Sequence, residues 1–361
     1  MSPDASPRPP PEPPELERVA SSLDDAALSL LDHYRRVAQR GALKALPRTG
    51  PREFYTDLLP AYLLRPGKGI RPVLCLASCV LHGGAPQDAL PLAVSLELLH
   101  SAFLVHDDIA DESTSRRGRP TLHTSHGVGL AINVGDALAT IATRHIRENV
   151  AHLRTPVAVE ILRAFDQMIA ATIEGQALDV GWREHNRFDV SVADYLDMIT
   201  KKTSWYTTIQ PLRMGALAAQ DRAVDHAALL RFGSSLGTLF QLVNDLNGLT
   251  AYRGGETACE DLLEGKRTLP LLHLHNNIDD AGRQRLRAIL STGRGSRSDD
   301  DVNWILAQME QLGSIAYGQQ CVRSMAVVAQ RNAEDAFAHV ADCDARTLVL
   351  GITSYVACSI A

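Results

Sequence analysis

The feature that most constrains this chain is an apolar run that ends in a cluster of acids and arginines. Residues 93–105 read AVSLELLHSAFLV and are almost wholly apolar. They lead directly into HDDIADESTSRRG, residues 106–118. A buried helix that ends in charged side chains is costly unless those charges are compensated. The segment therefore predicts a core helix that delivers acidic residues to the mouth of a cavity.

The three aspartates of this segment have the spacing of a metal site. On a helix, Asp107 and Asp111 share one face, one turn apart, with Asp108 beside them. Two carboxylates so close repel each other unless a positive charge lies between them. Mg²⁺ suits such a place, because it binds a few carboxylates and leaves its other positions to water and phosphate oxygens. Acidic runs are also common on solvated helix faces, and the apolar run before this one is what favours the metal.

Two sets of basic residues predict anion binding beside the acids. Arg116 and Arg117 follow the aspartates, and paired guanidinium groups suit bidentate phosphate binding. The earlier segment GKGIRP, residues 67–72, places Lys68 and Arg71 three apart near an expected helix start. A helix N-terminus with added cations attracts anions. Carboxylates, a divalent cation and arginines together indicate a diphosphate site.

With these pieces in order, the chain resembles the trans-isoprenyl diphosphate synthases, the polyprenyl synthetase family, from about residue 25 to residue 355. Seven segments carry the resemblance and occur in the family's order: GKGIRP, ELLHSAFLVHDDIADESTSRRGRPTLH, NVGDAL, EGQALD, KKTSWYT, FQLVNDL and DLLEGKRTLP. The resemblance implies an all-α isoprenoid synthase fold, with long helices around a central cavity, and a homodimer. It also implies a prenyltransferase of the geranylgeranyl diphosphate synthase type.

The implied reaction joins two diphosphates. An allylic diphosphate loses pyrophosphate, and the double bond of isopentenyl diphosphate attacks the resulting cation. The implied catalytic residues are Asp107, Asp108, Asp111, Lys202, Thr203 and Gln241. The implied substrate-binding residues are Lys68, Arg71, His100, Phe103, Arg116, Arg117 and Lys266. Two or three Mg²⁺ ions would be held by Asp107, Asp111, Asn244 and Asp245.

The second acidic motif departs from the family's DDxxD pattern. Here FQLVNDLNG places Asn244 where the first aspartate is expected and Gly248 where the last is expected. An amide oxygen binds Mg²⁺ more weakly than a carboxylate because it carries no charge. A lysine that the family has a few residues later is also absent, whereas Asp261 and Lys266 are retained. The altered motif puts the third metal ion in question.

Three functions stay open at this stage. The diphosphate-binding residues favour an active synthase. The altered second motif favours a class I terpene cyclase or an atypical prenyltransferase, although a cyclase needs no isopentenyl diphosphate pocket. The complete first motif opposes a non-catalytic regulatory subunit.

For a synthase, Ala102 and Phe103 lie one turn before Asp107, beneath the growing chain. One small and one aromatic residue there favour geranylgeranyl diphosphate, with farnesyl diphosphate as the runner-up.

Composition supports one large domain. The 361 residues are 45% hydrophobic, enough for a large core, and we assign residues 21–361 to one domain. Residues 1–20 form a proline-rich tail that we expect to be disordered. The net charge of −6 argues against a nucleic-acid partner. Glu97 and His100 within the apolar helix argue against an integral membrane span. With no secretory leader and no close cysteine pair, we expect a cytoplasmic protein.

Helical periodicity runs through the chain, and strand signals are few. We predict a loop or hinge at 292–301. Gln176 and Asp179 are expected to support the site, and His106 to make structural hydrogen bonds. The predicted helices are 23–40, 68–82, 87–111, 129–150, 156–179, 191–202, 204–219, 224–250, 267–276, 280–290, 302–313 and 315–339.

Overall fold

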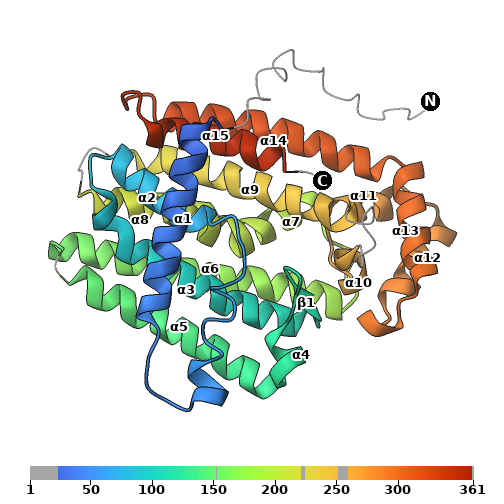
Figure 1. The fold of residues 1–361 in the computed structure, drawn as a ribbon. Helices are drawn as coiled ribbons and strands as arrows, with labels where there is room; N and C mark the ends of the chain where they lie inside the picture. The colour runs from blue at the N-terminus through green and yellow to red at the C-terminus, as the bar shows by residue number, and fades with distance from the viewer. Residues whose placement is uncertain (1–22, 152, 221–223, 251–258, 360–361) are drawn as a thin grey trace.

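The computed structural model describes residues 23–151, 153–220, 224–250 and 259–359. In these residues, long helices enclose the interior, and the only sheet is one small hairpin (Figure 1). The predicted all-α class is therefore confirmed. The proline-rich tail lies outside the described residues, so its disorder and the domain boundary at residue 21 stay predictions.

The longer helices follow the predicted periodicity. They are α1 (Asp25–Ala45), α2 (Ile70–Leu81), α3 (Pro86–Ala110), α5 (Val128–Val150), α6 (Thr155–Glu184), α9 (His226–Thr250), α13 (Asp299–Gln311) and α14 (Ser314–Ala336). The shorter ones are α4 (Leu122–His126), α7 (Val192–Ile199), α8 (Gln210–Ala218), α10 (Glu260–Glu264), α11 (Leu269–Asn277), α12 (Asp280–Leu290) and α15 (Asp344–Ala357). The remaining elements are β1 (Ser115–Arg116), β2 (Arg119–Pro120), the π-helices η2 (Arg52–Thr56) and η3 (Thr200–Ile209), and a 3₁₀ turn, η5 (Arg294–Ser296).

Helix α3 is a core helix of the bundle, as its apolar sequence predicts. It packs against α1, α2, α5 and α8. By length and composition alone it could cross a membrane, yet 67% of its most apolar window is buried inside the fold. Near its end, Nε2 of His106 lies 3.3 Å from Oδ1 of Asp136 on α5. This contact is the structural role that we predicted for His106, and it helps to fix the end of α3 that carries the aspartates.

The predicted helices 191–202 and 204–219 are wrong in one respect, because a π-helix joins them. Helix α7 ends at Ile199, η3 follows directly, and α8 begins at Gln210. The element η3 packs between α6 and α9. A Cβ on Gly175 of α6 would lie only 2.2 Å from the backbone N of Lys202, so the two backbones meet where glycine has no side chain. π-Helical segments are rare and often occur at functional sites.

Several boundaries differ from the predictions, since α1 ends at Ala45 and not at 40 and α6 ends at Glu184 and not at 179, and the short helices α4 and α10 were not predicted. Helix α2 starts at Ile70 and not at residue 68, because Gly69 has a left-handed conformation with φ of 63°. Helix α13 starts at Asp299, inside the predicted loop, because Ser298 and Asp301 form a capping box. Helix α15 was not predicted. Its β-branched residues and one glycine have low helix propensity, and packing against α1, α2, α9 and α14 stabilises it instead.

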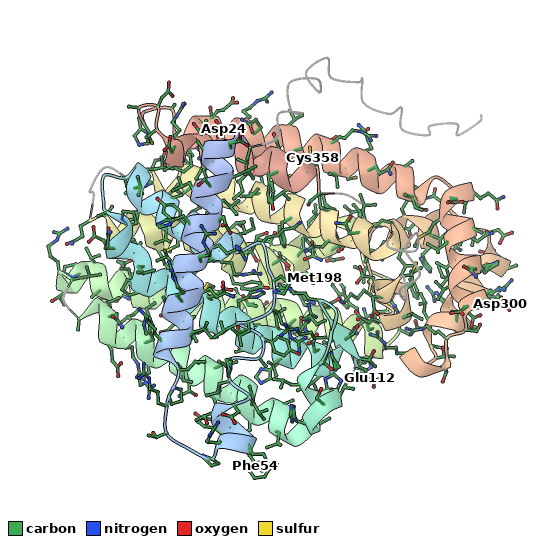
Figure 2. All side chains as sticks on the ribbon, viewed as in Figure 1. Asp24, Phe54, Glu112, Met198, Asp300 and Cys358 are labelled. Atoms are coloured by element: carbon green, nitrogen blue, oxygen red, sulfur yellow. The ribbon has the colours of Figure 1, made fainter. Side chains whose placement is uncertain are left out.

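Two apolar clusters hold the bundle together. The larger one joins α1, α2, α3, α5, α9, α14 and α15. The smaller one lies beneath α10 to α13, with Leu271, Ile305 and Met309 among its buried members. Met198 lies near the middle of the molecule, whereas Phe54 and Asp300 lie at its edges (Figure 2). The interior around Met198 is where the candidate site opens.

Candidate active site

A cavity of about 890 Å³ lies inside the helical bundle. Its walls come from α1, the loop before α2, α3, the β1–β2 hairpin, α6, α7, η3, α9, the segment 261–268 and α15. Most of the site residues predicted from the sequence line it. They are Lys68, Arg71, His100, Asp107, Arg116, Arg117, Lys202, Thr203, Gln241, Asn244, Asp245 and Lys266. The three that do not line it are Phe103, Asp108 and Asp111.

Asp107 lies on the cavity wall among cations. Nε2 of Gln176 donates a hydrogen bond of 2.9 Å to its Oδ1. The Lys202 ammonium and the Arg116 guanidinium each lie 3.7 Å from its carboxylate. Burial alone would raise the pKa of Asp107, but Lys202, Lys266 and Arg116 outweigh it and lower the pKa to about 2. Asp107 is therefore a fixed negative charge.

Asp108 faces away from the cavity and is fully buried. It accepts a 2.5 Å hydrogen bond from Nε of Arg116 and another from the Tyr62 hydroxyl. Arg65, also buried, donates to the backbone carbonyl of Arg116 at 2.9 Å and to that of Pro120 at 2.6 Å. Asp108 and Arg65 together hold the hairpin that presents the arginine pair. Nothing in the sequence of residues 57–65 indicated this support.

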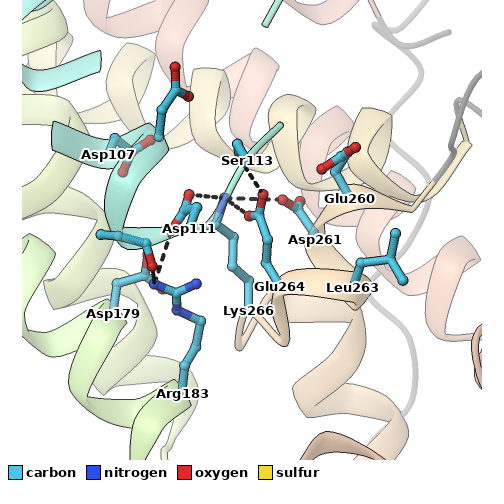
Figure 3. Close-up of polar contacts among 12 residues, drawn as sticks. Asp107, Asp111, Ser113, Asp179, Arg183, Glu260, Asp261, Leu263, Glu264 and Lys266 are labelled. Atoms are coloured by element: carbon cyan, nitrogen blue, oxygen red, sulfur yellow. Dashed lines mark hydrogen bonds and ion pairs between the residues drawn. The ribbon is translucent and has the colours of Figure 1, made fainter. Parts of the chain in front are cut away.

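Asp111 ends α3 and lies in a buried ionic network (Figure 3). Its carboxylate is 2.9 Å from Arg183 and 3.0 Å from the ammonium of Lys266. Lys266 also lies 2.5 Å from Glu264 and 3.4 Å from Asp261. Burial and the nearby Asp107 raise the pKa of Asp111 to about 6, although Lys266 opposes this shift. The acidic end of α3 is thereby joined to the DLLEGK segment.

Glu264 and Arg294 extend this network and were not predicted. The Ser113 hydroxyl donates to Oε1 of Glu264 at 3.1 Å. Nη1 of Arg294 donates to the same Oε1 at 2.8 Å and to the backbone carbonyl of Asp111 at 2.9 Å. Arg294 also pairs with Glu260. Arg294 comes from the segment predicted as a loop, and no motif marks it, so only the folded chain reveals it.

The EGQALD segment of α6 orients the central cations, as the predicted supporting roles of Gln176 and Asp179 require. The Lys202 ammonium lies 2.5 Å from the carboxylate of Asp179. Burial would lower the pKa of Lys202, but Asp179 and Asp107 outweigh it and raise the pKa. Gly175 admits the backbone of Lys202 against α6. The segment therefore sets both the charge and the position of Lys202.

A chain of hydrogen bonds crosses from η3 to α9. The Thr203 hydroxyl donates to Gln241 at 2.7 Å, and the Gln241 amide donates to Asp245 at 2.7 Å. The Tyr195 hydroxyl donates to the other oxygen of Asp245 at 2.6 Å. Burial raises the pKa of Asp245 to about 6, and these two donors oppose the rise. Asp245 is thus held firmly, with weak dipoles beside the cavity.

The altered positions of the second motif have different surroundings. Asn244 is exposed at the cavity. A Cβ on Gly248 would lie 2.2 Å from Oδ2 of Asp261, so the carboxylate of Asp261 occupies the space that a side chain at 248 would need. Burial raises the pKa of Asp261 to about 7, with Lys266 opposing and Asp245 adding to the rise. The motif therefore loses a carboxylate at 248, while Asp261 places another against it.

A second group of cations lines the cavity without carboxylate partners. No ion pair is made by Lys68, Arg71 or Arg117 with any residue that the structure describes. The ammonium of Lys68 donates to the Ser359 hydroxyl at 3.0 Å, and Arg71 donates to Thr207 at 2.8 Å. The Glu97 carboxylate lines the same cavity and interacts with Arg71 and Arg117, but the three cations outnumber it, so the group attracts anions.

His100 lies beside this cation group. Burial, together with Arg71 and Arg117, keeps the pKa of His100 well below its usual value, so the ring is neutral. Its Nδ1 is buried and has no hydrogen-bond partner among the described residues. A neutral imidazole there can hydrogen-bond to an anion without adding charge.

Phe103 lies behind the cavity wall. Its ring packs edge-on against Tyr206, with the centroids 5.6 Å apart, and Tyr206 lines the cavity. The guanidinium of Arg71 lies 4.1 Å from the Tyr206 ring centroid. Ala102 is fully buried in the core. A role for Phe103 in substrate binding would act through Tyr206, and it stays a prediction.

The carboxylate and amide oxygens of the site are ligands that suit a hard divalent cation, although the described side chains do not form a preassembled metal site. Within the described ranges, no three carboxylate, imidazole or thiol groups form a ready metal cluster. The ammonium of Lys266 lies among the carboxylates instead, and the two oxygens of Asp111 are paired with Arg183 and Lys266. Mg²⁺ usually binds one or two protein carboxylates and completes its shell with phosphate and water. The assignment of Asp107 and Asp111 as its ligands stays a prediction.

Comparisons with known proteins show which family this chain resembles. A family model described as polyprenyl synthetase matches residues 53–309. The short chain isoprenyl diphosphate synthase of Methanothermobacter thermautotrophicus is 31% identical over 309 residues, which cover 81% of this chain and 92% of that protein. The geranylgeranyl diphosphate synthase of Sulfolobus acidocaldarius is 36% identical over 205 residues, which cover 56% of this chain and 61% of that protein.

A solved structure supports the same assignment. The crystal structure of geranylgeranyl pyrophosphate synthetase from Pyrococcus horikoshii superposes with a TM-score of 0.80 and 26% sequence identity. The superposition covers 92% of this chain and 98% of the other. The predicted isoprenoid synthase fold is therefore confirmed. The chain belongs to the polyprenyl synthetase family.

Proposed function

We propose that this protein is a short-chain trans-prenyltransferase that condenses an allylic diphosphate with isopentenyl diphosphate. One observation carries the proposal. A single cavity contains a carboxylate-rich region around Asp107 and, separately, the cation group of Lys68, Arg71 and Arg117, which makes no direct ion pair with a described residue. The first region suits a diphosphate that arrives with divalent cations, and the second suits a diphosphate that arrives without them.

The allylic diphosphate is assigned to the region around Asp107. Asp107 and Asp111 would hold Mg²⁺, and Asn244 and Asp245 are candidates for a further ion. When bound, the metal neutralises the leaving pyrophosphate. Arg116, fixed by Asp108, contributes preorganised positive charge next to Asp107. The relatives named as isoprenyl diphosphate synthases support this assignment.

Isopentenyl diphosphate is assigned to the cation group of Lys68, Arg71 and Arg117. Arg71 is held over Tyr206 and against Thr207, so its guanidinium is already oriented. Preorganised donors bind an anion with little further loss of entropy. With the allylic diphosphate in the other region, both substrates would share one water-poor space.

The walls between the two regions can protect a carbocation. Leu104, Met198 and Phe240 give apolar surface, and Tyr206 gives an aromatic face. Excluding water prevents hydrolysis of a reactive intermediate. Thr203 and Gln241 are the predicted polar residues of this region, and the Thr203 hydroxyl donates to Gln241 at 2.7 Å.

We propose geranylgeranyl diphosphate as the main product and farnesyl diphosphate as the runner-up. The small Ala102 and the aromatic Phe103 support an intermediate length for the part of the cavity that holds the growing chain. Phe103 would limit that length through its contact with Tyr206. The names of the relatives from Sulfolobus and Pyrococcus support the longer product. The altered second motif keeps a cyclase as the second candidate.

A product assay tests these assignments. Purified protein is mixed with Mg²⁺, isopentenyl diphosphate and one allylic diphosphate of five, ten or fifteen carbons, and the products are separated by chain length. We expect elongation that needs both substrates and stops when the metal is chelated. A cyclic hydrocarbon formed from an allylic diphosphate alone would favour the cyclase. No turnover of any substrate, with both diphosphates still bound, would favour a regulatory subunit.

We further propose a cytoplasmic homodimer. Val128 and Ile132 on α5 and Ile173 on α6 are exposed apolar residues on neighbouring helices. Apolar side chains of this size are covered when two copies form an isologous interface. A mass measurement at micromolar concentration should give twice the chain mass. A monomer in that measurement would count against the proposal.

A further inference from the structure

Arg35 of α1 lies beside the GKG loop, outside the residues that the family model matches. It lines the cavity together with Lys68 and Arg71. A Cβ on Gly69 would lie 2.6 Å from Cγ of Arg35, so the arginine stem packs directly over this glycine. Helix α1 therefore adds a cation to a site that the recognised motifs attribute to later segments.

Arg117 has a matching position on the other side of Lys68. A Cβ on Gly67 would lie 2.7 Å from Nη1 of Arg117. The two glycines of the loop are thus each covered by an arginine, one from α1 and one from the β1–β2 hairpin. Close approach of this kind is possible only where no side chain intervenes.

Arg35 has a partner that it can exchange. Its Nη2 lies 2.5 Å from Oδ1 of Asp32, and its side chain is 31% exposed. The other oxygen of Asp32 pairs with Arg36. Asp32 would therefore keep a counter-charge if Arg35 turned toward a ligand, so the exchange leaves no charge without a partner. A half-exposed ion pair contributes little by itself, which makes it easy to replace.

The charge of Arg35 also affects the pKa of a carboxyl group on the cavity wall. Glu97 on α3 is half-buried on the cavity wall, and desolvation raises its pKa, whereas Arg71, Arg117 and Arg35 oppose the rise. Arg35, Arg71 and Arg117 thus all act on the same carboxylate, so Arg35 lies close enough to share the electrostatic environment of the cation group. The electrostatic effect agrees with the position of Arg35 on the cavity wall, which its contact with Gly69 establishes independently.

We propose that Arg35 is a further diphosphate-binding residue, which leaves Asp32 and binds the diphosphate held by Lys68, Arg71 and Arg117. The inference rests on the proposed function, in which this diphosphate belongs to isopentenyl diphosphate. A guanidinium can offer two parallel donors to phosphate oxygens, which an ammonium cannot. Arg35 then determines affinity for this substrate and has little influence on the chemical step.

Binding of inorganic pyrophosphate tests the inference without turnover. Calorimetry is done on the full chain in EDTA, so that binding through divalent cations is excluded. Arg35→Gln should bind pyrophosphate about tenfold more weakly, a typical loss for a hydrogen bond to a charged group. The matched control is Arg36→Gln. Arg36 pairs with the same aspartate but does not line the cavity, so this variant should bind pyrophosphate as the wild type does. Arg35→Lys should restore only part of the affinity.

Kinetics then identify the substrate. Arg35→Gln should raise the KM for isopentenyl diphosphate about tenfold, with kcat and the KM for the allylic diphosphate nearly unchanged. Wild-type pyrophosphate affinity in Arg35→Gln, or equal weakening in Arg36→Gln, would overturn the inference. If Arg35→Gln does not fold, Asp32→Asn tests the inference instead. This variant releases Arg35 from its ion pair and should bind pyrophosphate more tightly than the wild type. An unchanged pyrophosphate affinity would overturn the inference. If the wild-type protein elongates no substrate but Arg35→Gln still binds pyrophosphate more weakly than the wild type, only the proposed reaction is refuted.

Discussion

Replacing Gly175 with alanine tests whether the close contact between α6 and the π-helix η3 sets the active geometry. The new Cβ would lie 2.2 Å from the backbone N of Lys202 and 2.6 Å from its Cα. Both are backbone atoms, so no rotamer change can relieve the contact. The two elements must separate, and Lys202 must move with η3.

The size of the effect follows from these distances. An ordinary contact needs about 3.4 Å, so the backbones must part by about 1 Å. Overpacking of this kind costs about 1–3 kcal/mol, while alanine gains about 1 kcal/mol over glycine in helix propensity. A displacement of about 1 Å can reduce the rate about a hundredfold. Lys202 is sensitive to such a shift because it pairs with Asp179 at 2.5 Å and approaches Asp107 at 3.7 Å.

Gly181 supplies the matched control, because it lies in the same helix and a Cβ there meets nothing within 4 Å. Both variants gain the same propensity, so their difference isolates the steric cost. Gly175→Ala should melt a few degrees below Gly181→Ala, and its kcat should fall ten- to a hundredfold while Gly181→Ala stays near wild type. Melting is followed by circular dichroism, and kcat by incorporation of labelled isopentenyl diphosphate. Equal melting temperatures and a normal kcat for Gly175→Ala would refute the reasoning.

Four more substitutions follow from the site. Asp107→Ala should nearly abolish turnover while the helical fold is retained, and a near-normal rate in Mg²⁺ would refute its role as a metal ligand. Asn244→Asp should keep or raise the rate and lower the Mg²⁺ concentration needed for half-maximal activity, whereas loss of activity would favour the cyclase. Gly248→Asp should lower both stability and rate, because its Cβ would meet Asp261 at 2.2 Å; a gain in both would contradict that contact. Phe103→Ala should lengthen the products in a chromatographic assay, and unchanged products would place the floor elsewhere.

The charged motif at the end of α3 was predictable because the cost of burying charge leaves few alternatives. An apolar run that ends in aspartates must bring them to a cavity or to compensating charges, and the structure does both. Asp107 reaches the cavity, while Asp108 is buried against Tyr62 and Arg116. The periodicity that placed both on one helix could not tell which side of α3 faced the cavity.

The supporting residues were not predictable, because they come from segments far apart in the sequence. Arg294 is 183 positions from Asp111, whose carbonyl accepts its hydrogen bond. Arg65 orients the hairpin from an irregular segment without a periodic pattern. Side chains that pair across such distances have no local spacing to mark them. The π-helix was missed for a related reason, since packing between α6 and α9 decides its winding and its own sequence does not.

The altered second motif and the DLLEGK segment form one physical unit, and this bears on the choice between synthase and cyclase. Letter by letter, the motif loses two carboxylates, at Asn244 and Gly248. In the fold, the absent side chain at 248 leaves room for the carboxylate of Asp261, which lies 3.4 Å from the ammonium of Lys266. Asp261 is retained from the family pattern, so the region still has two aspartates fewer, but at 248 the carboxylate of Asp261 fills the space that a side chain would need. Asn244, exposed on the cavity wall, is then the position that distinguishes this chain, and its amide can still offer an oxygen.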